Sequence, residues 1–258
     1  MAGTIGIIGV GDIATAIVEG LAGAEDPPGS LVLSPRGRDH VASLVQRFPG
    51  LVTVAEDNQA VADAADTVIV AVLPEQMAEV LEPLTFRSSH VVISALAGVT
   101  IAEVRAAVGV DVPVIRAIPM PPVRNRAVAT VVTPEHPAAT EIFDVLGGTL
   151  PVADEAALSV FSSVTGAVSG YLHYLAVVCS WAESKGVPRD DAERFLRGLF
   201  AGLSPAITDT ATPMDQVVSD HETPGGLNAQ LRKTFFDVDG TASLEKALDE
   251  LRARVTGS

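Results

Sequence analysis

Short runs of Ile and Val recur through the first half of the chain, and segments with helical periodicity separate most of them. The apolar runs lie at residues 4–8, 31–34, 51–54, 67–72, 90–95, 112–118 and 127–133. The helical segments expected between them include residues 12–23, 39–48, 58–65 and 74–81. Strands that are apolar on both faces need cover on both faces, which intervening helices provide in a parallel sheet. The pattern therefore predicts a doubly wound, Rossmann-type α/β fold that continues to about Val152.

The pattern changes after Asp154, where the alternation of strands and helices ends. Residues 155–185 contain no proline and predict one long helix. Further helices are expected at 188–203, 224–235 and 241–254, with breaks at 186–188 and 239–241. The apolar content exceeds what a helical segment of about 100 residues buries alone, which favours a dimer interface. We therefore expect an α/β domain at residues 1–153 and an all-helical dimerisation domain at 154–258, assembled as a homodimer or higher homo-oligomer.

Composition excludes several classes of partner and site. A formal charge of −15 and a pI near 4.6 argue against nucleic acid or an anionic membrane as a partner. The single cysteine, Cys179, leaves no intramolecular disulfide and no Cys-based metal cluster to expect. No apolar run reaches the roughly 18 residues of a membrane span, and the N-terminus lacks a basic leader. We expect a soluble, cytoplasmic protein without a metal site, whose partner is a small molecule.

The first apolar run leads directly into a G-x-G-x-x-A sequence. Gly9 permits a tight turn, Gly11 lets a pyrophosphate approach the backbone, and Ala14 allows the following helix to pack closely on the strand. The helix that starts at Asp12 and Ile13 then presents free N–H groups to phosphate. The motif predicts a dinucleotide site, because it lies between a predicted strand and a predicted helix. The alternative is a turn in a related fold that binds no ligand.

The end of the second predicted strand indicates which dinucleotide binds. NAD sites usually place an acidic residue there, about 20 residues beyond the glycines, to hold the ribose hydroxyls. This chain instead has Ser34, Arg36 and Arg38. A hydroxyl and two guanidinium groups suit the 2′-phosphate of NADP. We therefore favour NADP over NAD; a purely structural turn is the alternative.

The carboxyl ends of later strands extend the same rim, since ligands of open α/β sheets lie beyond those ends. We expect the backbone of the following residues to lie along the nicotinamide half of the cofactor: Ala71, Val72, Leu73, Pro74, Ala95, Ala97 and Gly98. The next strand leads to Pro119 and Met120 at the same crevice.

An acid-free segment stands out in this acidic chain. Residues 112–134 contain no Asp or Glu, yet they include Arg116, Arg124 and Arg126. Each arginine alone is compatible with a solvated surface charge. As a group, they indicate a local site for an anion.

Six elements, in order and across essentially the whole chain, resemble the pyrroline-5-carboxylate reductase family. The glycine loop is similar to that family's G-x-G-N-M-A. The other five are similar to AVKPQ at 71–76, S-x-A-A-G-V-T at 94–100, RxMPNTP at 116–122, SGSGPAY at 165–171 and SPGGTT at 223–228. The resemblance implies NADPH as cofactor, hydride transfer to a cyclic imine in proline biosynthesis, and dimers interlocked through the C-terminal helices.

Departures from the family pattern fall mainly in its substrate half. Leu73 replaces a lysine and Met120 replaces an asparagine. Leu227 and Asn228 replace two threonines that help to hold the substrate carboxylate in the family. The polar wall at 167–170 is partly apolar here. We therefore expect the cofactor half of the site to be retained better than the substrate half.

The predicted long helix supplies candidate catalytic residues. Ser162, Thr165, Ser169 and His173 are spaced by 3, 4 and 4 residues, which places them on one face of a helix. The alternative for His173 is a histidine that only satisfies core or interface contacts.

Two further candidates come from the resemblance and from their position. Tyr171 matches the tyrosine of the fifth element, although it could serve only for packing. Asn228 and Gln230 follow the double glycine, where they could reach a substrate as neutral donors. A solvated helix start is the alternative for Asn228.

Hydride transfer to a protonated imine requires little from the protein beyond positioning, a dry pocket and suitable charges. A ketone would need a general acid, which the β-hydroxyacid dehydrogenases supply with a lysine on the long helix. The three lysines of this chain, Lys185, Lys233 and Lys246, fall elsewhere. We therefore favour an NADPH-dependent reductase of a cyclic imine. A same-fold reductase of another imine or a carbonyl, and a paralogue that binds NADP without catalysis, are the alternatives.

Overall fold

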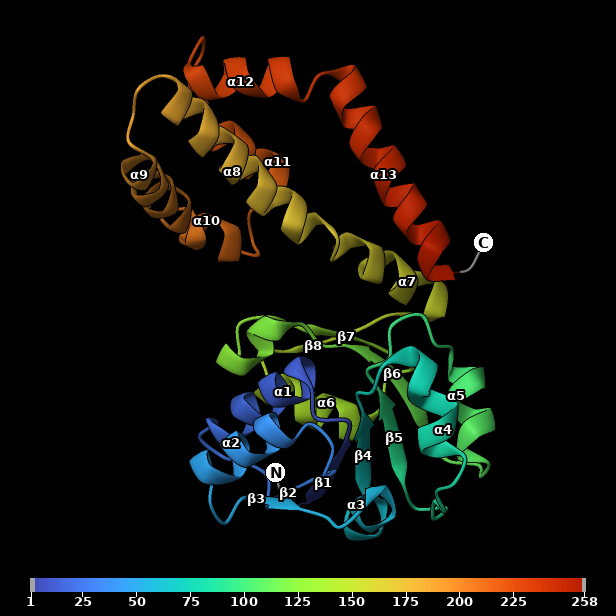
Figure 1. The fold of residues 1–258 in the computed structure, drawn as a ribbon. Helices are drawn as coiled ribbons and strands as arrows, with labels where there is room; N and C mark the ends of the chain where they lie inside the picture. The colour runs from blue at the N-terminus through green and yellow to red at the C-terminus, as the bar shows by residue number, and fades with distance from the viewer. Residues whose placement is uncertain (1–2, 257–258) are drawn as a thin grey trace. The chain divides into compact units, whose positions relative to one another are not determined.

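The computed structural model describes residues 3–256. By its internal contacts, the chain divides into two compact units. One unit holds the chain up to Ser162 together with the segment from Val255, and the other holds Ser163–Arg254. The first unit contains the sheet, and the second is helical (Figure 1).

In the described residues of the first unit, eight strands form one sheet. The strands are β1 (Thr4–Ile8), β2 (Ser30–Leu33), β3 (Val52–Val54), β4 (Thr67–Val70), β5 (Val91–Ser94), β6 (Val114–Ile118), β7 (Thr130–Thr133) and β8 (Thr149–Pro151). Their order is β3-β2-β1-β4-β5-β6-β7-β8, and the pairs from β3 to β6 are all parallel. The doubly wound α/β fold is therefore confirmed, with its change of direction between β1 and β4.

The far edge of the sheet differs from the prediction of a parallel sheet. β7 runs antiparallel to β6. Only residues 119–129 connect these two strands, and a parallel crossover takes about a dozen residues or more. The sequence pattern also misses β8, because its three residues are too few to show a period and end in Pro151.

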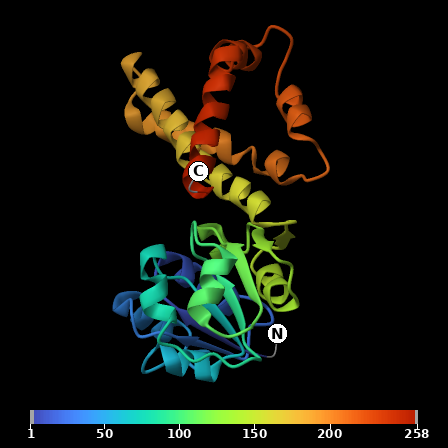
Figure 2. The ribbon, with the colours of Figure 1, turned by 90° about the vertical axis from the view of Figure 1, so that its right-hand side faces the viewer.

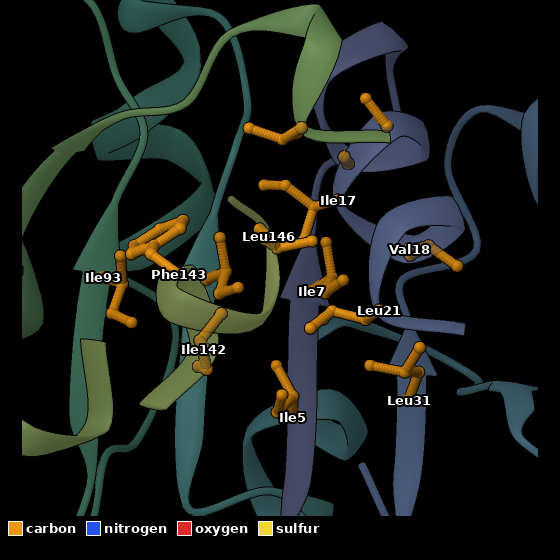
Figure 3. Close-up of a cluster of buried hydrophobic side chains, with 14 of the residues drawn as sticks. Ile5, Ile7, Ile17, Val18, Leu21, Leu31, Ile93, Ile142, Phe143 and Leu146 are labelled. Carbon is orange, nitrogen blue, oxygen red and sulfur yellow. The ribbon is translucent and has the colours of Figure 1, made fainter. Parts of the chain in front are cut away.

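Helices cover both faces of the sheet (Figure 1). They are α1 (Asp12–Ala22), α2 (Arg38–Arg47), α3 (Asn58–Ala64), α4 (Met77–Leu81), α5 (Ile101–Val108) and α6 (Pro137–Val145), with short 3-10 helices η1 (Pro74–Gln76) and η2 (Pro121–Asn125). Buried side chains of α1, α2 and α6 share one cluster, and those of α3, α4 and α5 share another. Neighbouring residues of β1, Ile7 and Ile8, belong to different clusters because successive side chains of a strand point to opposite faces. Figure 3 shows Ile7 in the first cluster, with Ile17 of α1 and Phe143 of α6.

The second half of the chain is all-helical, as predicted (Figures 1 and 2). Its helices are α7 (Glu155–Val164), α8 (Ala167–Ser184), α9 (Arg189–Ala201), α10 (Ser204–Thr208), α11 (Met214–Asp220), α12 (Leu227–Phe235) and α13 (Val238–Thr256). Within residues 3–256, no helix combines the length and the apolar character that a membrane span requires.

Two of the predicted helix boundaries are wrong. The long helix breaks between α7 and α8 at Gly166, where a Cβ atom would lie 2.6 Å from Cδ1 of Leu251 on α13. The predicted break at 239–241 falls inside α13 instead. That helix starts earlier because Asp237 caps its first turn, with Gly240 N donating to Asp237 Oδ1 at 2.8 Å.

His90 is a fully buried histidine just before β5. Its Nδ1 accepts a hydrogen bond from the backbone N–H of Arg87 at 3.0 Å, and its ring meets Phe86 edge to face. Burial, and then the positive charge of Arg87, lower the pKa of His90.

The lowered pKa of His90 predicts a loss of stability in acid. The unfolded histidine titrates near about pH 6.5, so its contribution is complete above that pH and declines as the pH falls toward the folded pKa. We expect the free energy of unfolding to fall as the pH drops below about 6.5, by at most about 1.4 kcal/mol per pH unit from this residue. His90→Gln should reduce that slope, and urea denaturation followed by circular dichroism measures it. His173→Gln, at an exposed histidine, is the matched control; equal slopes in all three proteins would contradict the prediction.

Candidate functional site

A pocket opens at the carboxyl ends of β1, β2 and β4 in the first unit. It lies where the strand order changes direction, which is the usual ligand position in open α/β sheets. Its lining consists of Ile8, Gly9, Val10, Gly11, Ser34, Arg36, Gly37, Asn58, Ala71, Val72, Leu73, Gln76 and Val80. The structure thus brings the glycine loop together with the ends of β2 and β4.

Gly9 makes the turn that follows β1, with a left-handed φ of 89°. A Cβ atom on this residue would lie 2.6 Å from Cγ1 of Val72 and 2.8 Å from the carbonyl carbon of Ala71. The backbone N–H of Gly9 donates to Oγ of Ser34 at 3.0 Å, and Ser34 is itself buried. Gly11, in contrast, has no atom within 4 Å of its Cβ position. The glycine loop is therefore fixed by its contacts with Ser34 and with the end of β4, while the Cβ position of Gly11 faces open space.

Gly37 joins the end of β2 to α2 and also has a left-handed backbone, with a φ of 82°. A Cβ atom on Gly37 would collide with the carbonyl oxygen of Val10, so α2 starts directly against the glycine loop. Arg36 and Arg38 flank Gly37 and are exposed. Arg36 Nη2 lies 3.9 Å from Glu79 Oε1 on α4, a contact between two exposed side chains that is worth little. The Arg36 side chain lines the pocket, and Arg38 follows two residues later as the exposed first residue of α2.

Seven of the predicted cofactor residues line this pocket: Gly9, Gly11, Ser34, Arg36, Ala71, Val72 and Leu73. Ala14 is fully buried against the sheet, which agrees with its predicted packing role. The other predicted cofactor residues do not line it, namely Asp12, Ile13, Arg38, Pro74, Ala95, Ala97, Gly98, Pro119 and Met120. They adjoin it or follow the ends of β5 and β6, and for them a cofactor contact remains a prediction.

Six residues that line the pocket are outside the predicted cofactor set: Ile8, Val10, Gly37, Asn58, Gln76 and Val80. Asn58 is the first residue of α3 and follows the turn after β3. Gln76 closes the short helix η1, and Val80 lies on α4. The rule that ligands lie beyond strand ends would have found Asn58, because β3 ends at the same edge of the sheet.

The three arginines of the acid-free segment do not form an anion site. Arg116 is buried on β6, and its Nη1 lies 2.7 Å from Oε1 of Glu155. Arg124 Nε lies 3.6 Å from Glu19 Oε2. Arg126 Nη1 donates to the carbonyl oxygen of Gly20 at 3.3 Å. Their charges serve contacts within the first unit, so this prediction is wrong: the two acids and the one carbonyl group that they contact lie far away in sequence.

Glu155 joins three elements of the first unit through one carboxylate. Besides the ion pair with Arg116, its Oε1 accepts a hydrogen bond from the backbone N–H of Ile101 at 3.0 Å. Thr100 caps the same helix, α5, and its hydrogen bonds lower the pKa of Glu103. The contact thus fixes β6 and the start of α5 to the start of α7.

The candidate catalytic residues lie in the second half of the chain, and the structure separates them. The break at Gly166 interrupts the predicted stripe, so Thr165 lies in the turn between the helices while Ser169 and His173 lie on α8. Ser169 Oγ donates to the carbonyl oxygen of Gly166 at 3.5 Å, and His173 is exposed. The prediction of one continuous polar face is therefore wrong.

Tyr171 and Asn228 both have partners inside the second unit. The Tyr171 ring packs edge to face on Phe200 of α9, with 5.9 Å between centroids. Asn228 Nδ2 donates to the carbonyl oxygen of His221 at 2.8 Å and so closes the loop before α12. In the same loop, the hydrogen bond from Arg232 lowers the pKa of Glu222.

Metal binding has no support from the side chains in residues 3–256. Among them, no group of three or more His, Cys, Asp or Glu side chains is placed to hold a metal ion.

The Arg116–Glu155 pair predicts a large cost when one partner is removed. Glu155→Gln leaves a buried guanidinium without its counter-charge, and we expect the free energy of unfolding to fall by about 3 kcal/mol. The double variant Arg116→Met/Glu155→Leu removes both charges and should recover most of the loss. Chemical denaturation gives the free energy of unfolding of the wild type and of each variant. Glu141→Gln, at an exposed carboxylate of α6, is the control. A loss no larger than in the control would show that the pair contributes nothing.

Comparison with known proteins agrees with this architecture along the whole chain. A family model described as "NADP oxidoreductase coenzyme F420-dependent" matches residues 4–98. The pyrroline-5-carboxylate reductase of Escherichia coli (strain K12) is 30% identical over 254 residues, which cover 95% of this chain and 94% of that protein. The structure of a pyrroline-5-carboxylate reductase from Coxiella burnetii matches with a TM-score of 0.84 and 24% identity, over 98% of this chain and 97% of that one. That of Plasmodium falciparum pyrroline carboxylate reductase with NADP bound matches with a TM-score of 0.79 and 16% identity, over 98% and 97%. The chain belongs to the pyrroline-5-carboxylate reductase family.

Proposed function

We propose that this chain reduces the C=N bond of a cyclic imine with a hydride from NADPH, as an enzyme of the proline-biosynthesis type. The observation that carries the proposal is the 30% identity to a pyrroline-5-carboxylate reductase across 95% of the chain. The pocket at the glycine loop supports it independently, because its position and lining suit a dinucleotide. We assign the cofactor domain to residues 1–153 and the helical domain to residues 154–258.

The residues of the pocket fit NADP. Open space at Gly11 leaves room for a pyrophosphate against the backbone, at the N-terminus of α1. Arg36 and Arg38 stand at the end of β2, where an NAD site would have an acid. The Ser34 hydroxyl accepts a hydrogen bond from the Gly9 N–H and so positions the loop, while its own proton can still be donated to a ligand. When bound, NADPH supplies the hydride.

The chain itself has to hold the imine, exclude water and keep the nitrogen protonated. Ketone reduction in this architecture would need an acid early in the long helix, and the lysines do not provide one. Lys185 follows the end of α8, Lys233 lies on α12 and Lys246 on α13. Our candidates for the substrate side are Thr165, Ser169, Tyr171 and His173, while Asn228 acts by closing its loop.

We also propose that the chain works as a homodimer in the cytoplasm, without a nucleic-acid or membrane partner. The second unit exposes many large apolar side chains, including Val168, Leu172, Trp181, Phe195 and Leu231. Exposed apolar area on this scale is typical of a surface that another subunit covers.

Arg36 and Arg38 predict a preference for NADPH over NADH. Charged hydrogen bonds to a 2′-phosphate contribute about 1.5–3 kcal/mol each, so replacing both by Ala should weaken NADPH binding at least about tenfold. NADH binding should barely change, because NADH lacks the 2′-phosphate. Isothermal titration with each cofactor measures both effects, and Arg105→Ala, an exposed arginine of α5, is the control. An equal loss for the two cofactors would contradict the assignment.

The substrate side predicts weak turnover of 1-pyrroline-5-carboxylate. Leu227 and Asn228 stand where the family has two threonines. Asn228 already donates to His221, and Arg116, Arg124 and Arg126 already contact groups of the first unit. A buried carboxylate without partners costs several kcal/mol, so we expect higher kcat/KM on bulkier or less polar cyclic imines.

A substrate panel tests this expectation. NADPH oxidation is followed with 1-pyrroline-5-carboxylate and with uncharged and aryl-substituted cyclic imines. Leu227→Thr should shift the ratio of kcat/KM values toward the carboxylate, whereas Leu231→Thr on the same helix should not. Wild-type turnover of 1-pyrroline-5-carboxylate at about 10⁴ M⁻¹s⁻¹ or above would refute the prediction. Cofactor binding without turnover of any imine would favour a non-catalytic role.

A further inference from the structure

Asp12 and His40 meet at the edge of the glycine loop. Asp12 is the first residue of α1, directly after the pocket residue Gly11, and its side chain is 92% exposed. His40 lies in the first turn of α2, and its Nε2 is 3.9 Å from Asp12 Oδ1. The other ring nitrogen, Nδ1, is 3.2 Å from Thr15 Oγ1. One ring nitrogen thus makes a hydrogen bond to the first turn of α1, and the other lies in a longer contact with the exposed Asp12 carboxylate.

A carboxylate at the position of Asp12 presents a problem for a dinucleotide site. The N-terminus of α1 attracts anions, and Gly11 leaves space there for a pyrophosphate. A negative side chain at the first helical residue repels that group. A cation beside the carboxylate would remove most of the repulsion.

We propose that His40 is a positioning residue of the cofactor site, which in its charged form offsets Asp12 and lets the pyrophosphate bind beside it. This inference rests on the proposed function, since it assumes that NADPH binds in this pocket. It assigns His40 a different task from Arg36 and Arg38, which face the 2′-phosphate. His40 acts on Asp12 and only through it on the cofactor.

Of the two acids of α1, Asp12 is the one that lies near His40. Glu19, the other acid of α1, pairs with Arg47 and Arg124. On α2, Arg38 and Asp39 precede His40 in the sequence, and both are exposed.

A double-mutant cycle tests the inference by binding, without turnover. NADPH is titrated calorimetrically at low salt into the wild type, His40→Gln, Asp12→Asn and the double variant. Exposed charge pairs contribute modestly, so we expect His40→Gln to weaken NADPH binding by about threefold to fivefold at pH 6. Asp12→Asn should bind at least as tightly as the wild type, and adding His40→Gln to it should cost nothing. In an Asp39→Asn background, the matched control, His40→Gln should cost as much as in the wild type.

A second ligand separates this role from a structural one. The nucleotide 2′-AMP carries the 2′-phosphate but no pyrophosphate, and its affinity is measured by competition with NADPH. We expect His40→Gln to leave 2′-AMP unchanged. An equal loss for both ligands, or a His40→Gln effect that persists with Asn at position 12, would overturn the role of His40 while leaving the NADP site intact. A wild type that does not bind NADPH would overturn the proposed function, and this inference with it.

Discussion

The carboxyl ends of β1, β2 and β4 approach one another so closely that glycine is required at two crossing points. At Gly9 the turn after β1 passes over Ala71 and Val72, and at Gly37 the start of α2 passes over Val10. Both residues have left-handed backbones, which other residues adopt only with strain. The pocket, and the direction in which α1 and α2 present their N-termini, follow from these two backbone contacts.

This close approach also decides which groups remain available to a ligand. Ser34 is enclosed beneath the loop, and its hydroxyl accepts from the loop itself. Arg36 and Arg38 are instead placed outside by the turn at Gly37 and remain exposed. The crossing thus fixes the shape of the pocket, while the exposed side chains around it are the ones free to vary.

Local patterns predicted the first half of the fold well, because its determinants are local. The glycine loop, the apolar strands and the helices between them each depend on neighbouring residues, and the sheet order follows from the doubly wound rule. The partners of charged residues could not be predicted in this way. Arg116 finds Glu155 39 residues further along the chain, and Arg126 finds Gly20 106 residues earlier. The contact at Gly166 is equally distant in sequence, since a Cβ atom there would lie 2.6 Å from Cδ1 of Leu251.

The polar residues that suggested a substrate site have partners in the structure that the sequence alone does not reveal. Arg116, Arg124 and Asn228 look available one by one, yet in the structure each one satisfies a carboxylate or a carbonyl of its own unit. Buried polar groups have to be paired, so a chain that encloses an arginine must also provide its acid. Leu227, in contrast, is an apolar side chain that lies largely exposed at the start of α12. The two parts of the candidate site differ in the same way: the glycine loop is positioned by backbone contacts at Gly9 and Gly37, whereas the candidate substrate residues are individual side chains whose hydrogen bonds lie within their own unit.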